Sequence, residues 1–228
     1  MLMQKEGREV LGLEIPEVKV HEMPIIGLDI NSLDNLDDIE FSSRWNNRVI
    51  SYVGSYGAWH SLDYILLTLS YFGEVISNCK AMIVSSQKLQ RDIDRNIRLV
   101  HIRHSEIADY YKSLLAVIVP GKKCTNYFDS SQLSTNLFST KATEALSCGV
   151  PLIVNSDIQG LSNFVLENKC GIVFKIRMDK ITLLNCSIQD LNSYEFWAEI
   201  TRNALEVGKQ FRLESVADKY LQYYQAIV

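Results

Sequence analysis

Short apolar runs alternate with segments of helical periodicity from residue 48 onward. The strand-like runs are rich in β-branched residues and are bounded by Gly, Pro, Asn or Ser; they are RVISYV, KAMIVSS, IRLVHI, LAVIVP, PLIVNS and CGIVF. Segments such as SLDYILLTLSYF and LSNFVLENK separate them and carry apolar residues at helical spacing. Strand and helix in alternation predict an α/β fold, in which a sheet of about six parallel strands is covered by helices on both faces.

The first part of the chain has a different texture. Residues 1–44 hold two prolines, the acidic run DINSLDNLDDIE and one strand-like alternation, EVKVHEMPII. At the other end, helical patterns span about 193–207 and 213–226. The 228 residues, 47% of them hydrophobic, suffice for one large domain, or one domain and an incomplete second. We expect a linker or domain remnant over 1–44, a domain over 45–210 and a terminal helix over 211–228.

Charge and cysteine usage exclude several classes of function. Lys and Arg number 23 against 27 Asp and Glu, and the basic residues are scattered, which disfavours nucleic acid as a general partner. Five dispersed cysteines show no metal-binding spacing, so we expect reduced thiols, a cytoplasmic protein and no metal site. No apolar run reaches the ~18 to 20 residues of a membrane span, although peripheral membrane contact stays open.

A ligand of such a sheet should lie beyond the carboxyl ends of its strands. The first candidate loop there is GSYG, in which Gly54 and Ser55 precede a helix that Ser61 could cap. Glycines let the backbone approach an anion, and the helix start supplies free N–H groups. The plain alternative is a tight strand-to-helix turn with Trp59 in the core. The loop lacks the GxGxxG pattern, and no acidic residue ends KAMIVSS, which argues against NAD.

The second candidate is the segment STKATEALSCGVP, residues 139–151. It predicts a helix that begins near Thr140 and ends at Gly149, which suits a left-handed cap. Lys141 stands in the first turn, where the helix dipole disfavours a cation, and Glu144 lies on the same face. A cation at a helix N-terminus favours phosphate, and the carboxylate could accept hydrogen bonds from a ribose diol. The alternative is an exposed Lys/Glu pair.

Two further strand ends carry weaker signals. Asn155 and Ser156 follow PLIVN; they are either caps and turn formers or a second phosphate-facing loop. Arg103 follows IRLVHI, and Ser105 beside it suits an N-cap. The four histidines permit no Ser/His/Asp, Cys/His or HExxH arrangement.

The order of these motifs resembles a known family. GSYGAWHSLDYIL, HSEIADYY and FSTKATEALSCGVPLIVNSDIQGLSNFVLENKCGIVF are similar to the donor-binding, carboxyl-terminal half of family 4 retaining glycosyltransferases of the GT-B architecture. The bacterial polysaccharide branch, with its GSxGxW loop and TKxxExLxxGxP helix, is the most similar, and the resemblance covers about residues 48–176. It implies one Rossmann-like domain, half of a GT-B enzyme.

The resemblance also implies a donor site. Glu144 would hold the ribose hydroxyls, Lys141 and the Gly54/Ser55 loop would meet the diphosphate, and the segment around Arg103 would border the base. The donor would be a nucleotide-sugar, with a UDP-sugar as first candidate. The family needs neither metal nor cofactor, because helix dipoles and cations neutralise the leaving diphosphate. No catalytic residue is assigned.

The sequence departs from the family pattern at several points. The family's paired glutamates, eight positions apart, fall on Asn136 and Glu144, so an amide replaces the first carboxylate. The basic pair of the first loop falls on Ser55 and His60. Only about 44 residues precede the sheet, whereas a two-domain enzyme has an acceptor domain of comparable size there. We expect a donor half that needs an acceptor domain or partner subunit for catalysis.

The leading hypothesis is therefore the nucleotide-sugar-binding domain of a retaining glycosyltransferase in cell-surface or capsular polysaccharide synthesis. The alternative is a catalytically inactive regulatory or structural subunit of the same fold that pairs with a separate partner. A sugar-nucleotide epimerase of related architecture would need a second domain and carboxylates that the sequence does not supply. We also expect the aromatic face with Tyr220, Tyr223 and Tyr224 to favour homo-oligomers, and the cytoplasmic protein to act near the inner membrane surface.

Overall fold

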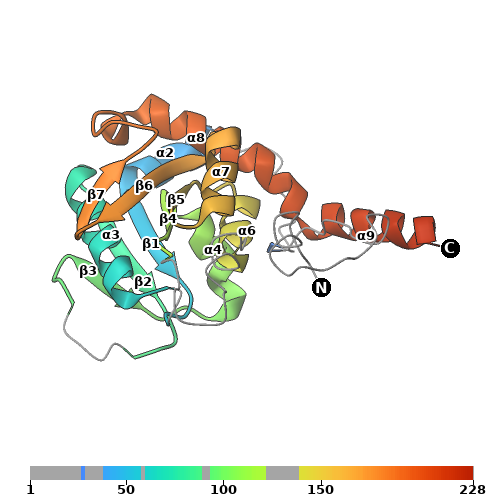
Figure 1. The fold of residues 1–228 in the computed structure, drawn as a ribbon, viewed down its shortest axis with the longest axis horizontal. Coiled ribbons are helices and arrows are strands. Elements are labelled where there is room, and N and C mark those ends of the chain that lie inside the picture. Colours follow the sequence, from blue (N-terminus) through green and yellow to red (C-terminus); the bar gives the residue numbers. More distant parts are fainter. Residues whose placement is uncertain (1–26, 29–37, 58–59, 89–92, 122–138, 228) are drawn as a thin grey trace.

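The computed structural model describes residues 27–28, 38–57, 60–88, 93–121 and 139–227. A seven-stranded sheet lies at the centre of this part of the chain (Figure 1). Its strands are β1 (Val49–Val53), β2 (Lys80–Val84), β3 (Ile97–Val100), β4 (Ala116–Val119), β5 (Leu152–Asn155), β6 (Gly171–Arg177) and β7 (Lys180–Leu183). All six predicted strands form; five lie inside the runs that predicted them, and β6 extends three residues past CGIVF, to Arg177.

The strands lie in the order β3-β2-β1-β4-β5-β6-β7. The first six pair in parallel, and β7 returns antiparallel to β6. The predicted α/β fold with a largely parallel sheet is confirmed. The seventh strand was not predicted: it is a four-residue edge strand, joined to β6 by a turn in which Met178 and Asp179 both have positive φ. Because its residues are only partly buried, their hydrophobic pattern is too weak to predict a strand.

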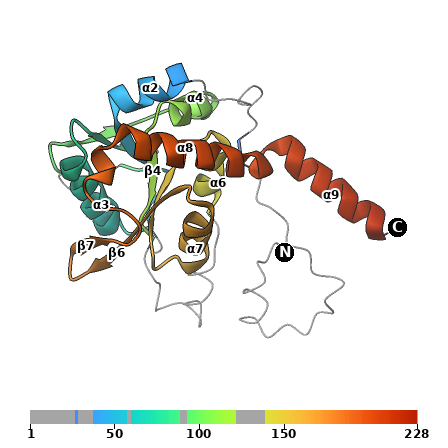
Figure 2. The ribbon, with the colours of Figure 1, turned by 90° about the horizontal axis from the view of Figure 1, so that it is seen from above.

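Helices cover both faces of the sheet. The described helices are α2 (Asp38–Asn47), α3 (Leu62–Val75), α4 (Ile107–Lys112), α6 (Thr140–Ser147), α7 (Gln159–Asn168), α8 (Tyr194–Gly208) and α9 (Leu213–Ile227), with short turns η2 (His104–Glu106), η3 (Asp190–Asn192) and η4 (Lys209–Phe211). α4, α6 and α7 pack on one face, and α2, α3 and the start of α8 pack on the other (Figures 1 and 2). Alternate strand residues enter each core, as the period of two requires.

Helix α2 belongs to the packed body. Phe41 lies in the core with α3 and α8, and Arg44 is fully buried. Gly27 donates from its backbone N–H to the carbonyl of Phe211, 2.7 Å away, which ties Gly27 to the short turn η4 that follows α8. The predicted limit at residue 44 therefore falls inside a helix that this domain buries.

The two closing helices lie where the sequence indicates them. α8 crosses the top of the sheet, and its last residue, Gly208, meets α6 so closely that a Cβ there would lie 1.8 Å from the carbonyl oxygen of Leu146. α9 then projects away from the body (Figures 1 and 2). Its exposed apolar side chains are Leu213, Leu221 and Tyr224.

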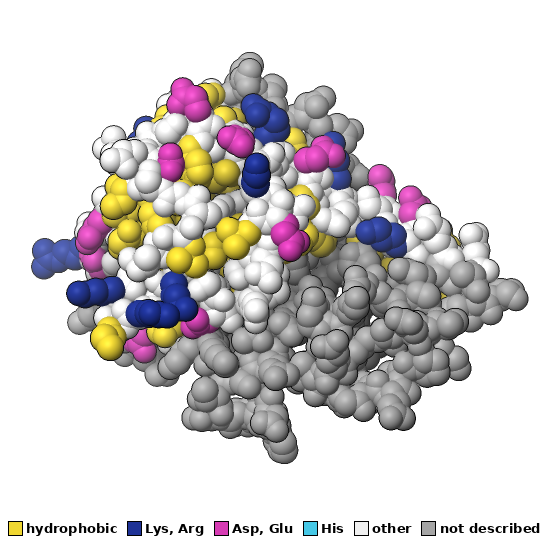
Figure 3. Space-filling view, turned by 45° about the horizontal axis from the view of Figure 1, so that its top comes forward, with side chains coloured by type: hydrophobic (Ala, Val, Ile, Leu, Met, Phe, Trp, Pro, Cys, Tyr) yellow, Lys and Arg dark blue, Asp and Glu magenta, His cyan; other side chains and the backbone are white. Residues whose placement is uncertain are grey.

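The surface carries both signs of charge. On the face shown in Figure 3, Lys and Arg side chains are interspersed with Asp and Glu, and apolar side chains lie between them. Within the described part of the chain, no helix combines the length and the apolar character that crossing a bilayer demands. Four cysteines, Cys79, Cys148, Cys170 and Cys186, are free thiols.

Candidate functional site

The strand order reverses between β1 and β4, which pair in parallel at the middle of the sheet. β2 and β3 extend the sheet on one side, and β5 and β6 extend it on the other. Loops that leave neighbouring strands in opposite directions open a crevice at the carboxyl ends of those strands, where ligands of this fold class bind. Gly54 follows β1 at this point, and α6 is the next helix after β4 that the structure describes.

Gly54 and Lys141 meet in this crevice. Gly54 has a φ of +125°, which only glycine adopts without strain, and its N–H donates to the carbonyl of Val84 at 2.9 Å. A Cβ at this position would lie 3.2 Å from Cε and 3.5 Å from Nζ of Lys141. The loop and the cation, predicted independently from two motifs, therefore lie side by side.

Helix α6 has the bounds that the sequence indicates. It begins at Thr140 after Ser139, and Gly149 follows it with a φ of +62°. Gly149 donates to the carbonyl of Leu146 and Val150 donates to that of Ala145, which together form a Schellman cap. The capped end fixes the helix register, so Lys141 stays in the first turn.

Lys141 is largely buried, yet it forms no ion pair with any described residue. Its Nζ donates to the hydroxyl of Tyr52 at 3.2 Å and lies 4.9 Å from the centre of the Tyr52 ring. Burial lowers the pKa of Lys141 to about 8, and the nearby Glu144 carboxylate opposes that shift. A cation in so poorly compensated a place is a favourable site for an anion.

Glu144 lies one turn further along α6 and is held by Tyr111 of α4. The Tyr111 hydroxyl donates to Oε2 of Glu144 at 3.1 Å, and the Tyr111 ring is buried in the core. Burial raises the pKa of Glu144, whereas the hydrogen bond from Tyr111 and the charges of His104 and Lys141 lower it. The carboxylate is therefore oriented. In the alternative interpretation, an exposed Lys/Glu pair, it would be free to rotate on the surface.

The loop after β1 contributes two more polar groups. The Tyr52 hydroxyl donates to the carbonyl of Ser55, which folds the loop back over the end of β1. The His60 ring lies 6.0 Å from the Tyr52 ring, and its buried Nδ1 has no hydrogen-bond partner among the described residues. Burial, aided by the charge of Lys141, lowers the pKa of His60 to about 4, so its imidazole is neutral at pH 7.

Other predicted residues lie apart from this cluster. Arg103 precedes η2, its side chain is 78% exposed, and it pairs with Glu106. Asn136 lies outside the described residues. Asn155 is buried and donates to the carbonyl of Gly121 at 2.8 Å, so it joins two loops as a turn former would. Ser61 stands at the N-cap of α3, but its hydroxyl forms no cap hydrogen bond.

Tyr52, Tyr111 and the buried position of His60 were not predicted as site features. Tyr52 lies near the end of the apolar run VISYV, and Tyr111 lies in a helix, so both resemble ordinary core aromatics. The available signal was their place near the end of an element, where a ring can be buried while its hydroxyl reaches the crevice.

The cluster suits an anion that carries hydroxyl groups. It offers a buried ammonium, the N-terminal turn of α6 and a glycine backbone on one side, and an oriented carboxylate on the other. Among the described residues, no group of three or more His, Cys, Asp or Glu side chains could hold a metal ion.

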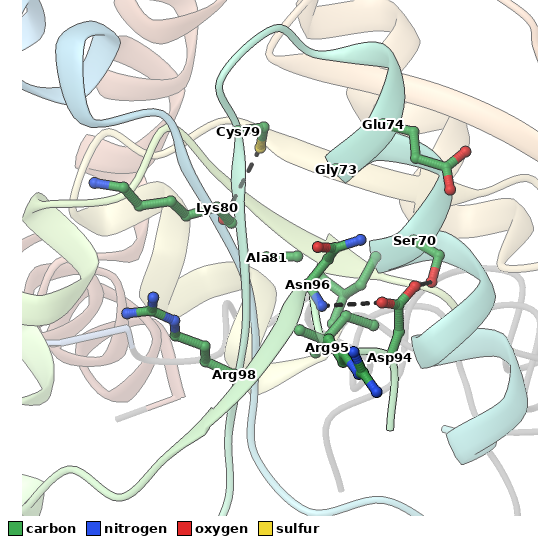
Figure 4. A pocket seen from close by; sticks show the side chains of 12 residues that line it. Ser70, Gly73, Glu74, Cys79, Lys80, Ala81, Asp94, Arg95, Asn96 and Arg98 are labelled. Carbon is green, nitrogen blue, oxygen red and sulfur yellow. Dashed lines mark hydrogen bonds between the residues drawn. The ribbon is translucent and has the colours of Figure 1, made fainter. Parts of the chain in front are cut away.

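A separate pocket of about 360 Å³ lies between α3 and the starts of β2 and β3 (Figure 4). Asp94 there accepts hydrogen bonds from the Ser70 hydroxyl and from the Asn96 backbone N–H. The amino ends of the strands form its wall, so it lies at the opposite edge of the sheet from Gly54 and Lys141. It is not part of the candidate site.

Solved structures that match this chain are glycosyltransferases. TarM of S. aureus, as a mutant in complex with fondaparinux, alpha-GlcNAc-glycerol and UDP, matches with a TM-score of 0.62 and 13% identity, over 97% of this chain and 42% of TarM. WaaG, a glycosyltransferase involved in lipopolysaccharide biosynthesis, matches with a TM-score of 0.56 and 12% identity, over 96% of this chain and 60% of WaaG. The pneumococcal O-GlcNAc transferase GtfA, in complex with UDP and GlcNAc, matches with a TM-score of 0.55 and 15% identity, over 92% of this chain and 40% of GtfA; a GtfA/B complex also matches, with a TM-score of 0.52.

At 12 to 15% identity, these structural matches show that the chain and these proteins share a fold. The chain has the fold of one Rossmann-like half of a GT-B glycosyltransferase, and it spans between 40% and 60% of the length of these three structures. No protein-family model matches the sequence, and no curated protein matches it.

Proposed function

We propose that this chain is the donor-binding half of a retaining GT-B glycosyltransferase, and that it binds a nucleotide diphosphate-sugar, with a UDP-sugar as the first candidate. The observation that carries the proposal is the placement of Lys141 beside Gly54 at the strand-order reversal, with the oriented Glu144 carboxylate one turn further along α6. The shared fold with glycosyltransferases supports the same interpretation.

Each side chain would do a different part of the work. The Lys141 ammonium and the N-terminal N–H groups of α6 would neutralise the diphosphate, first in the bound donor and then as it leaves. The Gly54 backbone would let the phosphates approach closely, because no side chain stands there. Glu144 would accept hydrogen bonds from the ribose hydroxyls. In a retaining reaction the acceptor would attack on the face that the leaving diphosphate vacates.

The acceptor would be held by another domain or subunit. The chain spans 42% of TarM and 60% of WaaG, and transfer requires both substrates in one geometry. We therefore propose that this half binds donor on its own and transfers sugar only with an acceptor-binding partner. Polysaccharide synthesis at the cytoplasmic face of the membrane is the proposed setting.

The alternative is a structural or regulatory subunit of the same fold. The observation that favours it is the loop after β1, where Ser55 and a neutral His60 supply no fixed positive charge beside Lys141. The GtfA/B complex among the matches is a precedent for paired subunits. Such a subunit would keep the fold without binding a nucleotide.

Calorimetric titration of the purified chain with UDP, GDP and ADP separates the two. For a donor half, one diphosphate binds in the micromolar to millimolar range, and Lys141→Ala and Glu144→Ala each weaken binding by about 1.5 to 3 kcal/mol. Lys112→Ala is the matched control, because Lys112 pairs with Asp109 on the surface of α4. If no diphosphate binds the folded chain, the subunit hypothesis replaces the proposal.

A further inference from the structure

Two buried tyrosine hydroxyls hold the charged residues of the candidate site from opposite faces of the sheet. Tyr52 belongs to the core under α3, and Tyr111 belongs to the core under α6. Both side chains are fully shielded from solvent. Tyr52 contacts Lys141, and Tyr111 contacts Glu144.

The Tyr52 hydroxyl joins the two phosphate-facing elements. It accepts a hydrogen bond from Nζ of Lys141 at 3.2 Å and donates one to the carbonyl of Ser55. The donor and the acceptor functions of one hydroxyl are thus both in use, one toward α6 and one toward the loop after β1. Because the ring is locked in the core, the hydroxyl fixes the ammonium and the loop relative to each other.

Tyr111 does the corresponding work for the carboxylate. Its hydroxyl donates to Oε2 of Glu144, which restricts the rotation of the carboxylate and leaves Oε1 for a second donor. Burial would otherwise favour the protonated carboxyl group, and the hydrogen bond from Tyr111 lowers the pKa of Glu144 against that effect. A charged, oriented acceptor is what a ribose diol needs.

We propose that Tyr52 and Tyr111 are positioning residues that divide the donor between them, Tyr52 serving the diphosphate through Lys141 and Tyr111 serving the ribose through Glu144. This inference rests on the proposed function. Neither tyrosine touches the donor; each acts through the side chain that it orients, as outer partners of a binding site do.

The chain offers a matched control in Tyr110, the neighbour of Tyr111 on α4. Its hydroxyl donates to Oγ of Ser51 at 3.0 Å and lies 3.6 Å from Sδ of Met82, so it serves the sheet and not the crevice. Tyr→Phe at positions 52, 110 and 111 removes one oxygen atom and keeps the ring. The three variants therefore differ only in which partner loses its hydrogen bond.

The test compares the binding of uridine and of UDP, measured by ligand-observed NMR and calorimetry. Tyr52→Phe should weaken UDP binding about 5- to 20-fold and leave uridine binding within about twofold of wild type. Tyr111→Phe should weaken both ligands by a similar factor, about 3- to 10-fold, because both contain the ribose. Tyr110→Phe should change neither.

The pH profile of UDP binding supplies a readout that a purely structural role would not move. The titratable groups facing Lys141 are Tyr52 from β1, His60 from the following loop and Glu144 from α6. Since the ammonium has a pKa of about 8, the affinity of the wild type for UDP should fall as the pH rises above that value. Without its acceptor the ammonium is less stable, so Tyr52→Phe should move this fall to lower pH, whereas Tyr110→Phe should leave it in place.

The outcomes separate this inference from the proposed function. If the folded wild-type chain fails to bind UDP, the proposed function fails. If the wild type binds and Tyr52→Phe keeps its affinity and pH profile, or Tyr111→Phe keeps its affinity for both ligands, the positioning roles are wrong. Should Tyr52→Phe not fold, 3-fluorotyrosine at position 52 keeps the ring and weakens the hydroxyl as an acceptor; unchanged UDP affinity in that protein would equally overturn the role of Tyr52.

Discussion

Arg44 donates a hydrogen bond to the carbonyl oxygen of Gly149, 105 positions further along the chain, from a side chain that is 1% exposed. Nη1 lies 2.8 Å from that oxygen, and Nη2 lies 3.1 Å from the carbonyl oxygen of Cys148. Both carbonyls terminate α6, the helix that carries Lys141. A buried cation thus stabilises the negative end of the site helix, and α2 becomes part of what holds the site together.

Replacing Arg44 by Met should be costly. The change removes the charge and leaves two buried carbonyls of the α6 terminus without these donors, so we expect the free energy of unfolding to fall by about 2 to 4 kcal/mol. Urea denaturation measures this loss. Arg48→Met is the comparison, because Arg48 also donates to backbone carbonyls but does so in part at the exposed surface. For this variant the free energy of unfolding should fall by about half as much or less. Equal losses at the two positions would contradict the role given to Arg44.

Two helical glycines should respond to alanine in opposite directions. At Gly208 of α8 a Cβ would lie 1.8 Å from the Leu146 carbonyl oxygen, so Gly208→Ala should force α8 and α6 apart and cost more than about 2 kcal/mol. At Gly73 of α3 the nearest atom is the Cβ of Ala81 at 3.6 Å, an ordinary contact. Gly73→Ala should therefore stabilise the chain by about 0.5 to 1 kcal/mol through helix propensity. Thermal unfolding of the two variants checks both signs.

His60 should make the chain sensitive to mild acid. In the folded chain its pKa is about 4, against 6.5 in the unfolded chain, so the unfolded state takes up the proton first as the pH falls. Stability is then lost between about pH 6.5 and pH 4, and His60→Gln should reduce that loss by about 2 kcal/mol. Urea titrations across this range measure it. The control is His101→Gln, at an exposed histidine, which should lose as much unfolding free energy between about pH 6.5 and pH 4 as the wild type does. If His60→Gln also loses as much as the wild type, the imidazole of His60 is not buried in its neutral form.

Lys141 should likewise make stability rise with pH, in this case on the alkaline side. Its pKa is about 8 in the folded chain and 10.5 in the unfolded chain, so the folded chain loses the proton first as the pH rises. The free energy of unfolding should consequently increase by about 2 kcal/mol between pH 8 and pH 10, relative to that of Lys141→Met. Denaturation at several pH values tests this. Parallel pH profiles for the two proteins would show that the ammonium is not desolvated.

The projecting helix α9 should promote self-association. Leu221 and Tyr224 are 58% and 66% exposed on it and, three positions apart, lie on the same face of the helix. We expect the weight-average mass in sedimentation experiments to rise with concentration, and Leu221→Glu with Tyr224→Glu to abolish the rise. The double variant Gln222→Glu with Gln225→Glu adds the same two charges to the same helix without removing apolar surface, and its mass should still rise with concentration. A strictly monomeric wild type at high concentration would refute the expectation.

The fold was predictable because apolar periodicity is a local property of the sequence. The six parallel strands are continuous runs such as AVIV in β4, which is buried along its whole length. β7 escaped prediction because its four residues, KITL, alternate between exposed and partly buried positions and form no continuous apolar run. Helix α2 was not predicted, because the acidic residues around it resemble those of a linker. Its buried Arg44 could not be predicted either, because arginine is normally a surface residue and its partner Gly149 is distant in the sequence.

The candidate site was predictable only in part. The helical spacing placed Lys141 and Glu144 on one face, and the residue type of Gly54 permits the positive φ that it adopts. The approach of Gly54 to Lys141 depends on which strands are neighbours, and the strand order cannot be predicted from the local sequence of any one segment. Tyr52 and Tyr111 were missed because burial of their rings, which any core requires, hides the separate task of their hydroxyls.

The pairing of β1 with β4 has a consequence for how the protein is made. β1 lies at the middle of the sheet, but Ile50 pairs with Ala116, so one edge of β1 stays open until the ribosome has delivered residues far downstream. The hydrogen bonds of Arg44 form later still, because their acceptors are the carbonyls of residues 148 and 149. In a nascent chain that has emerged only as far as β3, the central strand has one edge without its partner, and Arg44 lacks its carbonyl acceptors. Synthesis of the second half is thus the step that commits the first half to its native place.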